Sequence, residues 1–317
     1  MRLPIRKTGP HGFGLMYHVI HLNDDLTTLM DWYRKVFDAD VWWPADGPNL
    51  SEIEDRYAAL LNVSDLCVEP MAPRQPINDR FPVGRFYLRH GRRFHSLGFL
   101  VDDIEGFARS LIERDVYIGL PGGGRMEEVP PDIYYFYPSP RSTGGLMAQI
   151  TRNTDGAYSA AVGDDPRIQE DWDVRARRWS EHPLGIRRFG YATMAVSDVD
   201  ATKKMLEDTW HAVPVYDGVD DGRGVRSSFV QLGHFLVEVA SPLTDGPMAE
   251  HVARFGDMLY QLTFLVHDLD AVERYLPSVG VRCARNAPTV VSADVDDCLG
   301  ANYAFSNETC PGDPLAL

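Results

Sequence analysis

The most regular feature of the chain is a pattern of hydrophobic and polar positions that occurs four times. A short apolar run ends at an acidic turn, and a segment with apolar residues at helical spacing follows. The runs with their turns cover residues 17–25, 94–103, 191–198 and 260–268, and the segments after them cover residues 26–37, 104–114, 199–210 and 269–276. Such apolar runs are typical of strands, and an Asp before an amphipathic segment is typical of a helix N-cap. The pattern predicts four strand–helix units.

Further strand-like stretches follow each predicted helix. In the first half of the chain they include residues 58–63, 66–70, 134–137 and 145–150, and in the second half residues 228–232 and 235–240. Turn residues separate these stretches, so each unit is predicted to fold as β-α-β-β-β. We therefore expect an α+β protein that is built from four tandem βαβββ modules.

A polar and charged segment interrupts the repeats between the second and third modules. It covers residues 153–183, and part of it, residues 168–179, is expected to be helical. We interpret this segment as a linker between two halves of the chain. The N-terminal half is expected to cover residues 1–152 and the C-terminal half residues 184–317.

Composition restricts the class of function. The 317 residues include 31 Lys and Arg but 46 Asp and Glu, so the formal net charge is −15. This charge disfavours nucleic acid and anionic membranes as partners, and no apolar run approaches the roughly 20 residues of a membrane span. The four cysteines, Cys67, Cys283, Cys298 and Cys310, lie far apart and form no paired motif. We expect a cytoplasmic protein that acts on a small molecule and possesses no nucleic-acid or membrane partner, with a homodimer as one option.

Four tandem modules that each open with an apolar strand ending in Asp-Leu, Asp-Ile or Asp-Val resemble the vicinal oxygen chelate superfamily. This group includes glyoxalase I, methylmalonyl-CoA epimerase, the bleomycin- and fosfomycin-resistance proteins and the extradiol dioxygenases. The resemblance covers nearly the whole chain apart from the linker. It implies that the modules pair two and two into two half-open barrel domains, with a metal inside a barrel.

In this superfamily the first and last strands of each module supply the metal ligands. The matching positions of the N-terminal half are His18, Glu69, His95 and Gln149. Two imidazoles, one carboxylate and one amide oxygen suit a single divalent ion, which chemically includes Fe²⁺, Mn²⁺, Ni²⁺, Co²⁺ and Zn²⁺.

The C-terminal half departs from this ligand pattern. Its matching positions are Tyr191, Glu238, Gln261 and Ala304. Because Glu238 alone among them is a good ligand, the resemblance implies a degenerate site that has lost its metal.

The orientation of His95 is left open by the spacing between the histidine and the helix cap. Family members place the metal histidine about seven residues before the capping Asp; His18 precedes Asp25 by seven residues, but His95 precedes Asp103 by eight. If Asp103 is the cap, Ser96 faces the cavity and His95 faces away, because side chains alternate along a strand. A β-bulge near His95 would return it to the cavity.

The first strand has a related ambiguity. His21 lies three residues after His18 and faces the opposite way, so either histidine can be the inner one. Tyr135, Tyr137 and Arg141 are candidates for substrate contacts, with ordinary sheet packing as the alternative for the tyrosines.

A basic cluster separates the first two modules. It consists of Arg85, Arg89, Arg92 and Arg93. Such arginines capture a carboxylate or phosphate on a substrate, or they lie in solvent and balance nearby acids.

The resemblance implies a metal-dependent lyase or isomerase of the glyoxalase or epimerase type. Such an enzyme transfers a proton next to the carbonyl of a small oxygen-chelating substrate. Glu69 is the candidate base, and it would have to leave the metal during turnover. The alternatives are an Fe²⁺ extradiol dioxygenase that uses His18, His95 and Glu69, and a metal-free binding protein of the resistance type.

Overall fold

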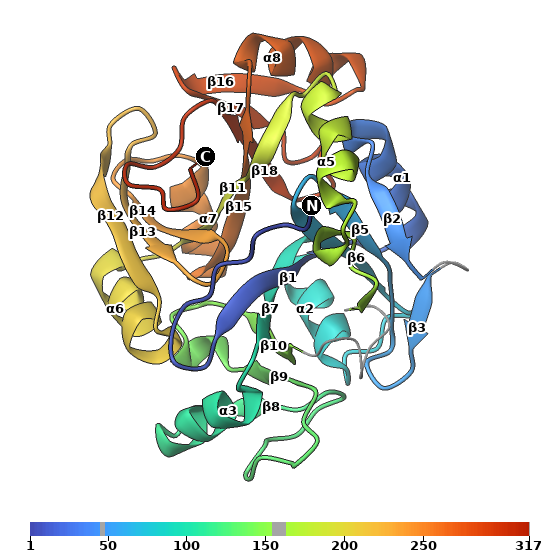
Figure 1. Ribbon diagram of the computed structural model, residues 1–317, viewed down its shortest axis with the longest axis vertical. Coiled ribbons are helices and arrows are strands. Elements are labelled where there is room, and N and C mark those ends of the chain that lie inside the picture. Colours follow the sequence, from blue (N-terminus) through green and yellow to red (C-terminus); the bar gives the residue numbers. More distant parts are fainter. Residues whose placement is uncertain (45–47, 154–162, 317) are drawn as a thin grey trace.

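Two mixed β-sheets form the core of the computed structural model, which describes residues 1–44, 48–153 and 163–316 (Figure 1). The first sheet has the strand order β2-β5-β6-β1-β7-β10-β9-β8, with β3 and β4 attached at one side. The second sheet has the order β12-β13-β14-β11-β15-β18-β17-β16. In both sheets the two central strands are antiparallel and begin successive modules. The expected α+β architecture of four βαβββ modules in two half-open barrels is confirmed.

Ten strands and three α-helices lie in the described residues of the N-terminal half. Its strands are β1 (Phe13–Leu22), β2 (Asp40–Trp43), β3 (Asn49–Ser51), β4 (Arg56–Ala58), β5 (Leu60–Val63), β6 (Leu66–Pro73), β7 (Arg93–Val101), β8 (Ile118–Gly119), β9 (Tyr135–Pro138) and β10 (Ala148–Arg152). Its helices are α1 (Leu26–Phe37), α2 (Pro82–His90) and α3 (Ile104–Glu113). A short 3₁₀ turn covers Pro140–Ser142.

The C-terminal half repeats this order of elements. Its strands are β11 (Ile186–Ala195), β12 (Val213–Asp220), β13 (Val225–Gln231), β14 (Leu236–Pro242), β15 (Met258–Val266), β16 (Cys283–Ala287), β17 (Val290–Ala293) and β18 (Asn302–Ser306). Its helices are α6 (Val199–Trp210), α7 (Pro247–Phe255) and α8 (Leu269–Ser278).

The four predicted caps are present. The carboxylates of Asp25, Asp103, Asp198 and Asp268 each accept a hydrogen bond from a backbone N–H in the first turn of the following helix. These bonds satisfy donors that a helix leaves free at its start. Because Asp103 is the cap of α3, the eight-residue spacing to His95 is the true one.

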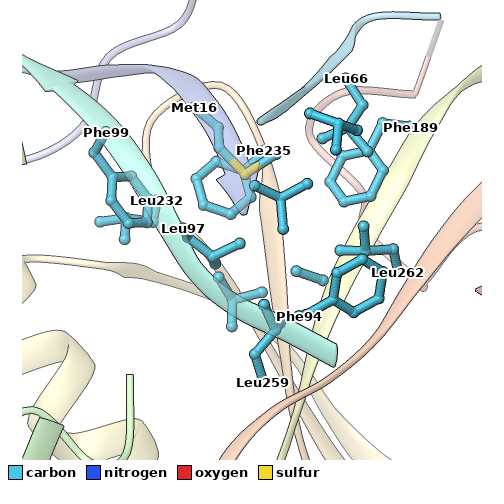
Figure 2. Close-up of a cluster of buried hydrophobic side chains, with 14 of the residues drawn as sticks. Met16, Leu66, Phe94, Leu97, Phe99, Phe189, Leu232, Phe235, Leu259 and Leu262 are labelled. Carbon is cyan, nitrogen blue, oxygen red and sulfur yellow. The ribbon is translucent and has the colours of Figure 1, made fainter. Parts of the chain in front are cut away.

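One hydrophobic core joins the two halves. Figure 2 shows side chains of both sheets in a single cluster, with Leu97 and Phe99 from β7 beside Phe235 and Leu262 from the second half. Helices of the two halves also pack against each other. The ring of Trp210, at the end of α6, lies 5.6 Å from that of Phe107 in α3.

The linker contributes to the same packing. Of the expected segment 153–183, residues 154–162 lie outside the described residues. A 3₁₀ turn covers Pro166–Ile168, and the expected helix is α5 (Trp172–Glu181), which begins four residues later than predicted. Trp179 of α5 is buried and donates a hydrogen bond from Nε1 to the carbonyl oxygen of Phe37 at 3.1 Å. Among the described residues, the structure contains no helix that is long and apolar enough to span a membrane.

Candidate functional site

A β-bulge in β7 decides the orientation of His95. Val19 of β1 pairs with Leu97, but His21 pairs with Phe94, so β7 has one extra residue between these two pairs. Both His95 and Ser96 consequently face the inside of the first barrel, where they line a cavity of about 400 Å³.

The two histidines of β1 have different surroundings. His18 points into the barrel, where it lines a smaller cavity of about 130 Å³. His21 points the other way: its Nδ1 lies 2.9 Å from Oη of Tyr33, and its Nε2 lies 3.2 Å from the carbonyl oxygen of Leu299. His18 is therefore the inner histidine, and His21 contributes to the packing between the halves.

Glu69 and Gln149 line the same small cavity as His18. Oε2 of Glu69 lies 3.2 Å from Nε2 of His18, and both side chains are almost completely buried. The amide nitrogen of Gln149 donates a hydrogen bond to Thr151, 3.1 Å away. Tyr135 completes this wall of the cavity.

Gly98 provides the space for the His18 ring. It pairs with His18 across the central strands, and a Cβ atom at this position would lie 2.7 Å from Nε2 of His18. Real side chains do not approach so closely, so any substitution at Gly98 would displace the imidazole from Glu69.

Arg56, which is the partner of Glu69, is not among the residues predicted from the sequence. Nη1 of Arg56 lies 3.1 Å from Oε1 of Glu69, and Nη2 lies 2.8 Å from Oε2 of Glu54. Tyr137 donates a hydrogen bond to the other carboxylate oxygen of Glu54 at 2.8 Å. Arg56 lines both cavities of the first barrel, so its guanidinium is within reach of a molecule in either one.

The electrostatics of the cluster leave Glu69 close to its titration point at neutral pH. Burial raises the pKa of Glu69 to about 7, even though the Arg56 guanidinium opposes this shift. Burial and the positive charge of Arg56 lower the pKa of His18 to about 3, so this imidazole is neutral. The cluster thus combines one fixed cation, one neutral ring and one carboxyl group that can gain or lose a proton.

The equivalent glutamate in the second barrel is in a different state. Glu238 accepts hydrogen bonds from the hydroxyls of Thr193 and Ser227, both at 2.6 Å, and forms an ion pair with Arg223. Although burial acts in the opposite direction, Arg223 and the two hydroxyls hold the pKa of Glu238 below its usual value. Every oxygen of Glu238 is engaged, so this half keeps the carboxylate–arginine pair as a structural element.

The C-terminal segment covers the second barrel. Cys310 belongs to one buried cluster with Tyr191, the residue that stands where the first barrel has His18, and Leu315 packs against this cluster. The carboxylate of Asp313, near the end of the chain, forms an ion pair with Arg188. Among the described residues of the second barrel, Tyr191 thus replaces the inner histidine, and both carboxylate oxygens of Glu238 are engaged.

The residues of the first barrel match the metal site that the resemblance implies only in part. The separation of 3.2 Å between His18 and Glu69 is compatible with two ligands of one ion, but His95 lines the other cavity, and its Nδ1 lies 2.9 Å from Oγ of Ser96. In the described ranges no three His, Cys, Asp or Glu side chains are close enough to hold a metal together. A cation on Glu69 would also lie near Arg56, and like charges 4 Å apart repel by about 4 kcal/mol at an effective dielectric constant of 20.

The remaining candidates are divided among several environments. Arg141 is exposed in the 3₁₀ turn after β9 and lies outside the lining of both cavities. Arg85 lines the larger cavity and donates hydrogen bonds to two backbone carbonyls, while Arg92 forms an ion pair with Asp24.

A sequence signal for Arg56 exists in retrospect. Arg56 precedes Glu69 by 13 residues, and Arg223 precedes Glu238 by 15 residues. Each arginine lies shortly before the hairpin whose second strand holds the glutamate. A comparison of the two halves at separations of 13 to 15 residues would have paired each arginine with the glutamate of its own half.

Comparisons with known proteins agree with this architecture. No family model matches the sequence, and no curated protein matches it. A mutant of 4-hydroxymandelate synthase from Streptomyces coelicolor is similar in structure over 92% of this chain and 91% of its own, with a TM-score of 0.59 and 13% identity. Methylmalonyl-CoA epimerase from Mycobacterium tuberculosis matches 40% of this chain and 90% of its own, with a TM-score of 0.36 and 22% identity.

The similarity to the synthase extends over both halves of the chain and therefore includes both barrels. At 13% identity it concerns the fold and not the activity. The chain therefore has the fold of the vicinal oxygen chelate superfamily.

Proposed function

We propose that this protein is an enzyme that transfers a proton at the carbon next to a carbonyl group, with Glu69 as the base and Arg56 as the stabiliser of the oxygen. The observation that carries the proposal is the buried Glu69–Arg56 pair, at 3.1 Å, in the wall of a cavity. The pair supplies a proton acceptor and a fixed positive charge side by side. This arrangement is what enolate formation needs.

The proposed step uses groups that the pair leaves available. Arg56 directs two of its nitrogens at Glu54 and one at Glu69, so it retains N–H groups for the carbonyl oxygen of a substrate. Glu69, as the carboxylate, takes the proton from the adjacent carbon; the electron pair of the C–H bond forms a C=C bond, and the π pair of the carbonyl group moves to its oxygen. Return of this proton to the other carbon or to the opposite face gives isomerisation, and return of a proton after Glu69 has exchanged its own with water gives exchange with solvent.

His18 assists this step without being charged. Oε2 of Glu69 lies 3.2 Å from Nε2 of the neutral imidazole, which has no hydrogen-bond partner among the described residues, so a small reorientation of the protonated carboxyl group would let it donate a hydrogen bond there. His18 therefore stabilises the form of Glu69 that exists after proton abstraction. Tyr137 holds Glu54, which in turn holds the Arg56 guanidinium in position.

The cavity restricts the substrate to a small molecule. Its volume of about 130 Å³ is below the range of about 300–1,000 Å³ that is typical of sites for drug-sized ligands. A two-oxygen compound of three or four carbons, such as a 2-oxo acid or a hydroxyketone, has this size. Tyr135 in the same wall is the candidate for contact with its carbon chain.

The metal-dependent form of this reaction and the extradiol dioxygenase both need His95 next to His18 and Glu69. Because His95 lines the other cavity, we do not propose either one. The metal-free binding protein remains as the second candidate. It is favoured by the cavity of about 400 Å³ on the other side of Arg56, where Ile20, Met71 and Phe86 form an apolar wall.

Deuterium exchange tests the proposal. Protein treated with a chelator, with its metal content verified by mass spectrometry, is incubated in D₂O with pyruvate, 2-oxobutyrate or hydroxyacetone, and proton NMR follows the loss of the α-proton signals. We expect exchange with the metal-stripped protein and at least a 100-fold loss of rate in Glu69→Gln, because general-base catalysis contributes about 10²–10⁴-fold. Glu238→Gln, the same change at the equivalent position of the second barrel, is expected to retain the rate.

Two results would contradict the proposal. Exchange that requires added Mn²⁺, Ni²⁺, Co²⁺, Fe²⁺ or Zn²⁺ would return the metal to the mechanism. Saturable binding of these compounds, without exchange and without an effect of Glu69→Gln, would assign a binding function to the cavity.

A further inference from the structure

A third cavity lies where the two halves of the chain meet. It has a volume of about 580 Å³ and is lined by the end of α2, the start of β7, one face of α7, the start of β15 and the loop before β18. It shares no lining residue with the two cavities of the first barrel. A cavity of this size is in the range of small-molecule sites, which is about 300–1,000 Å³.

Two arginines lie on the same aromatic ring in this cavity. The guanidinium carbon of Arg93 lies 3.5 Å from the centre of the Phe255 ring, and that of Arg254 lies 4.8 Å from it. Neither arginine forms an ion pair with a carboxylate in the part of the chain that the structure describes. Two guanidinium groups thus lie near one ring without a carboxylate partner among the described residues, in a chain whose net charge is −15.

Arg93 is the more constrained of the two. Its Nε donates a hydrogen bond to the carbonyl oxygen of His90 at 3.0 Å, and its Nη1 lies 3.4 Å from the sulfur of Met258. Burial and the nearby Arg254 lower the pKa of Arg93 to about 10, which reflects the cost of this unneutralised charge. An anion between the two guanidinium groups would offset that cost.

Two imidazoles add further donors to the same wall. His90 lies at the end of α2 and His251 in the middle of α7, and both line the cavity. Within the described residues neither ring makes a hydrogen bond. Burial and the positive charge of Arg93 lower the pKa of His251 to about 4, so its ring is neutral and carries one N–H group.

The acidic residues of the cavity do not neutralise this cluster. Glu250 and Asp296 also line the cavity, but both side chains are exposed. Arg92, another lining residue, is already paired with Asp24. Water and salt screen exposed carboxylates, so the field at Arg93 and Arg254 remains positive.

We propose that this cavity binds the phosphate group of a small organic phosphate, with Arg93 and Arg254 as the primary contacts. A phosphate dianion carries several acceptor oxygens and two negative charges, which match two guanidinium groups and two imidazole N–H donors. The volume is larger than a free phosphate needs, and Tyr87 and Tyr260 in the wall provide surface for the organic part. This site is separate from the Glu69–Arg56 pair, so it stands or fails independently of the proposed enzyme activity.

Isothermal titration calorimetry on the full chain at pH 7.5 and low ionic strength tests this site. The probes are ribose 5-phosphate, inorganic phosphate and ribose. We expect ribose 5-phosphate to bind more tightly than inorganic phosphate, and ribose not to bind. Arg93→Met and Arg254→Met are each expected to weaken binding by about tenfold or more, since a charge-assisted hydrogen bond contributes about 1.5–3 kcal/mol.

Arg89→Met is the matched control. Arg89 occupies in α2 the position that Arg254 occupies in α7, counted from the first-turn prolines Pro82 and Pro247, but it does not line the cavity. This variant should bind the probes like the unmodified protein. Arg254 is exposed, so its replacement does not endanger folding, in contrast to that of the half-buried Arg93.

An NMR titration of the histidines supplies a second readout. Bound phosphate should raise the pKa of His251 toward the ordinary range, because it adds negative charge beside the ring. Absence of binding up to 10 mM of both phosphates would overturn the proposal. Equal weakening of binding in Arg89→Met and Arg254→Met, or no effect of Arg254→Met, would also overturn it. Tighter binding of inorganic phosphate than of ribose 5-phosphate would overturn the proposal that the cavity also contacts the organic part of the ligand.

Discussion

Replacement of Glu69 by Gln should change the way in which stability depends on pH. The folded protein raises the pKa of Glu69 from 4.5 to about 7 through burial. Between these two pH values the folded state keeps a proton that the unfolded state has released. As the pH rises through this window, the free energy of unfolding of the unmodified protein therefore falls by about 1.4 kcal/mol per pH unit because of this group alone.

The total effect follows from the same shift. About 2.5 pH units at 1.36 kcal/mol each give a loss of about 3 kcal/mol between pH 4.5 and pH 7. Glu69→Gln removes the titration and nearly preserves the shape of the side chain. The stability of the unmodified protein relative to Glu69→Gln is thus expected to be about 3 kcal/mol lower at pH 8 than at pH 4.5.

Urea unfolding at several pH values, followed by tryptophan fluorescence, measures this difference. Glu238→Gln serves as the control, because the pKa of Glu238 is lowered and its contribution is lost only as the pH falls below the ordinary glutamate range. Between pH 5 and pH 8 the difference between the unmodified protein and Glu238→Gln should stay constant. A constant difference for Glu69→Gln over the same window, or one that rises with pH, would refute our account of the Glu69 environment.

Three further substitutions test a buried ion pair, the core between the two halves and the space that holds His18. Asp165→Asn should destabilise the protein by about 3–5 kcal/mol in urea unfolding, because it leaves the fully buried guanidinium of Arg167 without its carboxylate; a loss below 1 kcal/mol would contradict this. Phe235→Ala should lower the free energy of unfolding by about 3–5 kcal/mol, since its ring fills the core between the two halves (Figure 2), and the halves should still unfold in one transition. Gly98→Ala should abolish the proposed proton exchange while the protein stays folded by circular dichroism, because the added methyl group displaces His18; a normal rate would argue against a role for this ring.

Local sequence determined the elements and their order. Apolar runs of strand length, each followed by an Asp and a helical stripe, specify a strand, a cap and a helix through contacts within a few residues. For this reason the caps at Asp25, Asp103, Asp198 and Asp268 and the four-module architecture could be predicted without any long-range information. The position of Glu69 on the inner face was implied by the resemblance to the superfamily and not by the local pattern.

The orientation of His95 could not be predicted in this way. It depends on the pairing of Val19 with Leu97 and of His21 with Phe94, which introduces an extra residue into β7. Such a bulge is a property of two strands together, and the spacing within one strand does not reveal it. The bulge turns His95 inward, but it places the ring in the larger cavity, apart from His18 and Glu69.

The tertiary structure alone decided the chemistry of the candidate site. Arg56 reaches Glu69 because β4 pairs with β6, and a long side chain on this hairpin can span the cavity wall. The resemblance implied that the carboxylate of Glu69 would face the inside of the first barrel. Whether that carboxylate meets a metal or a guanidinium depends on which charges folding brings within a few ångströms, since electrostatic interactions act through space and not along the chain.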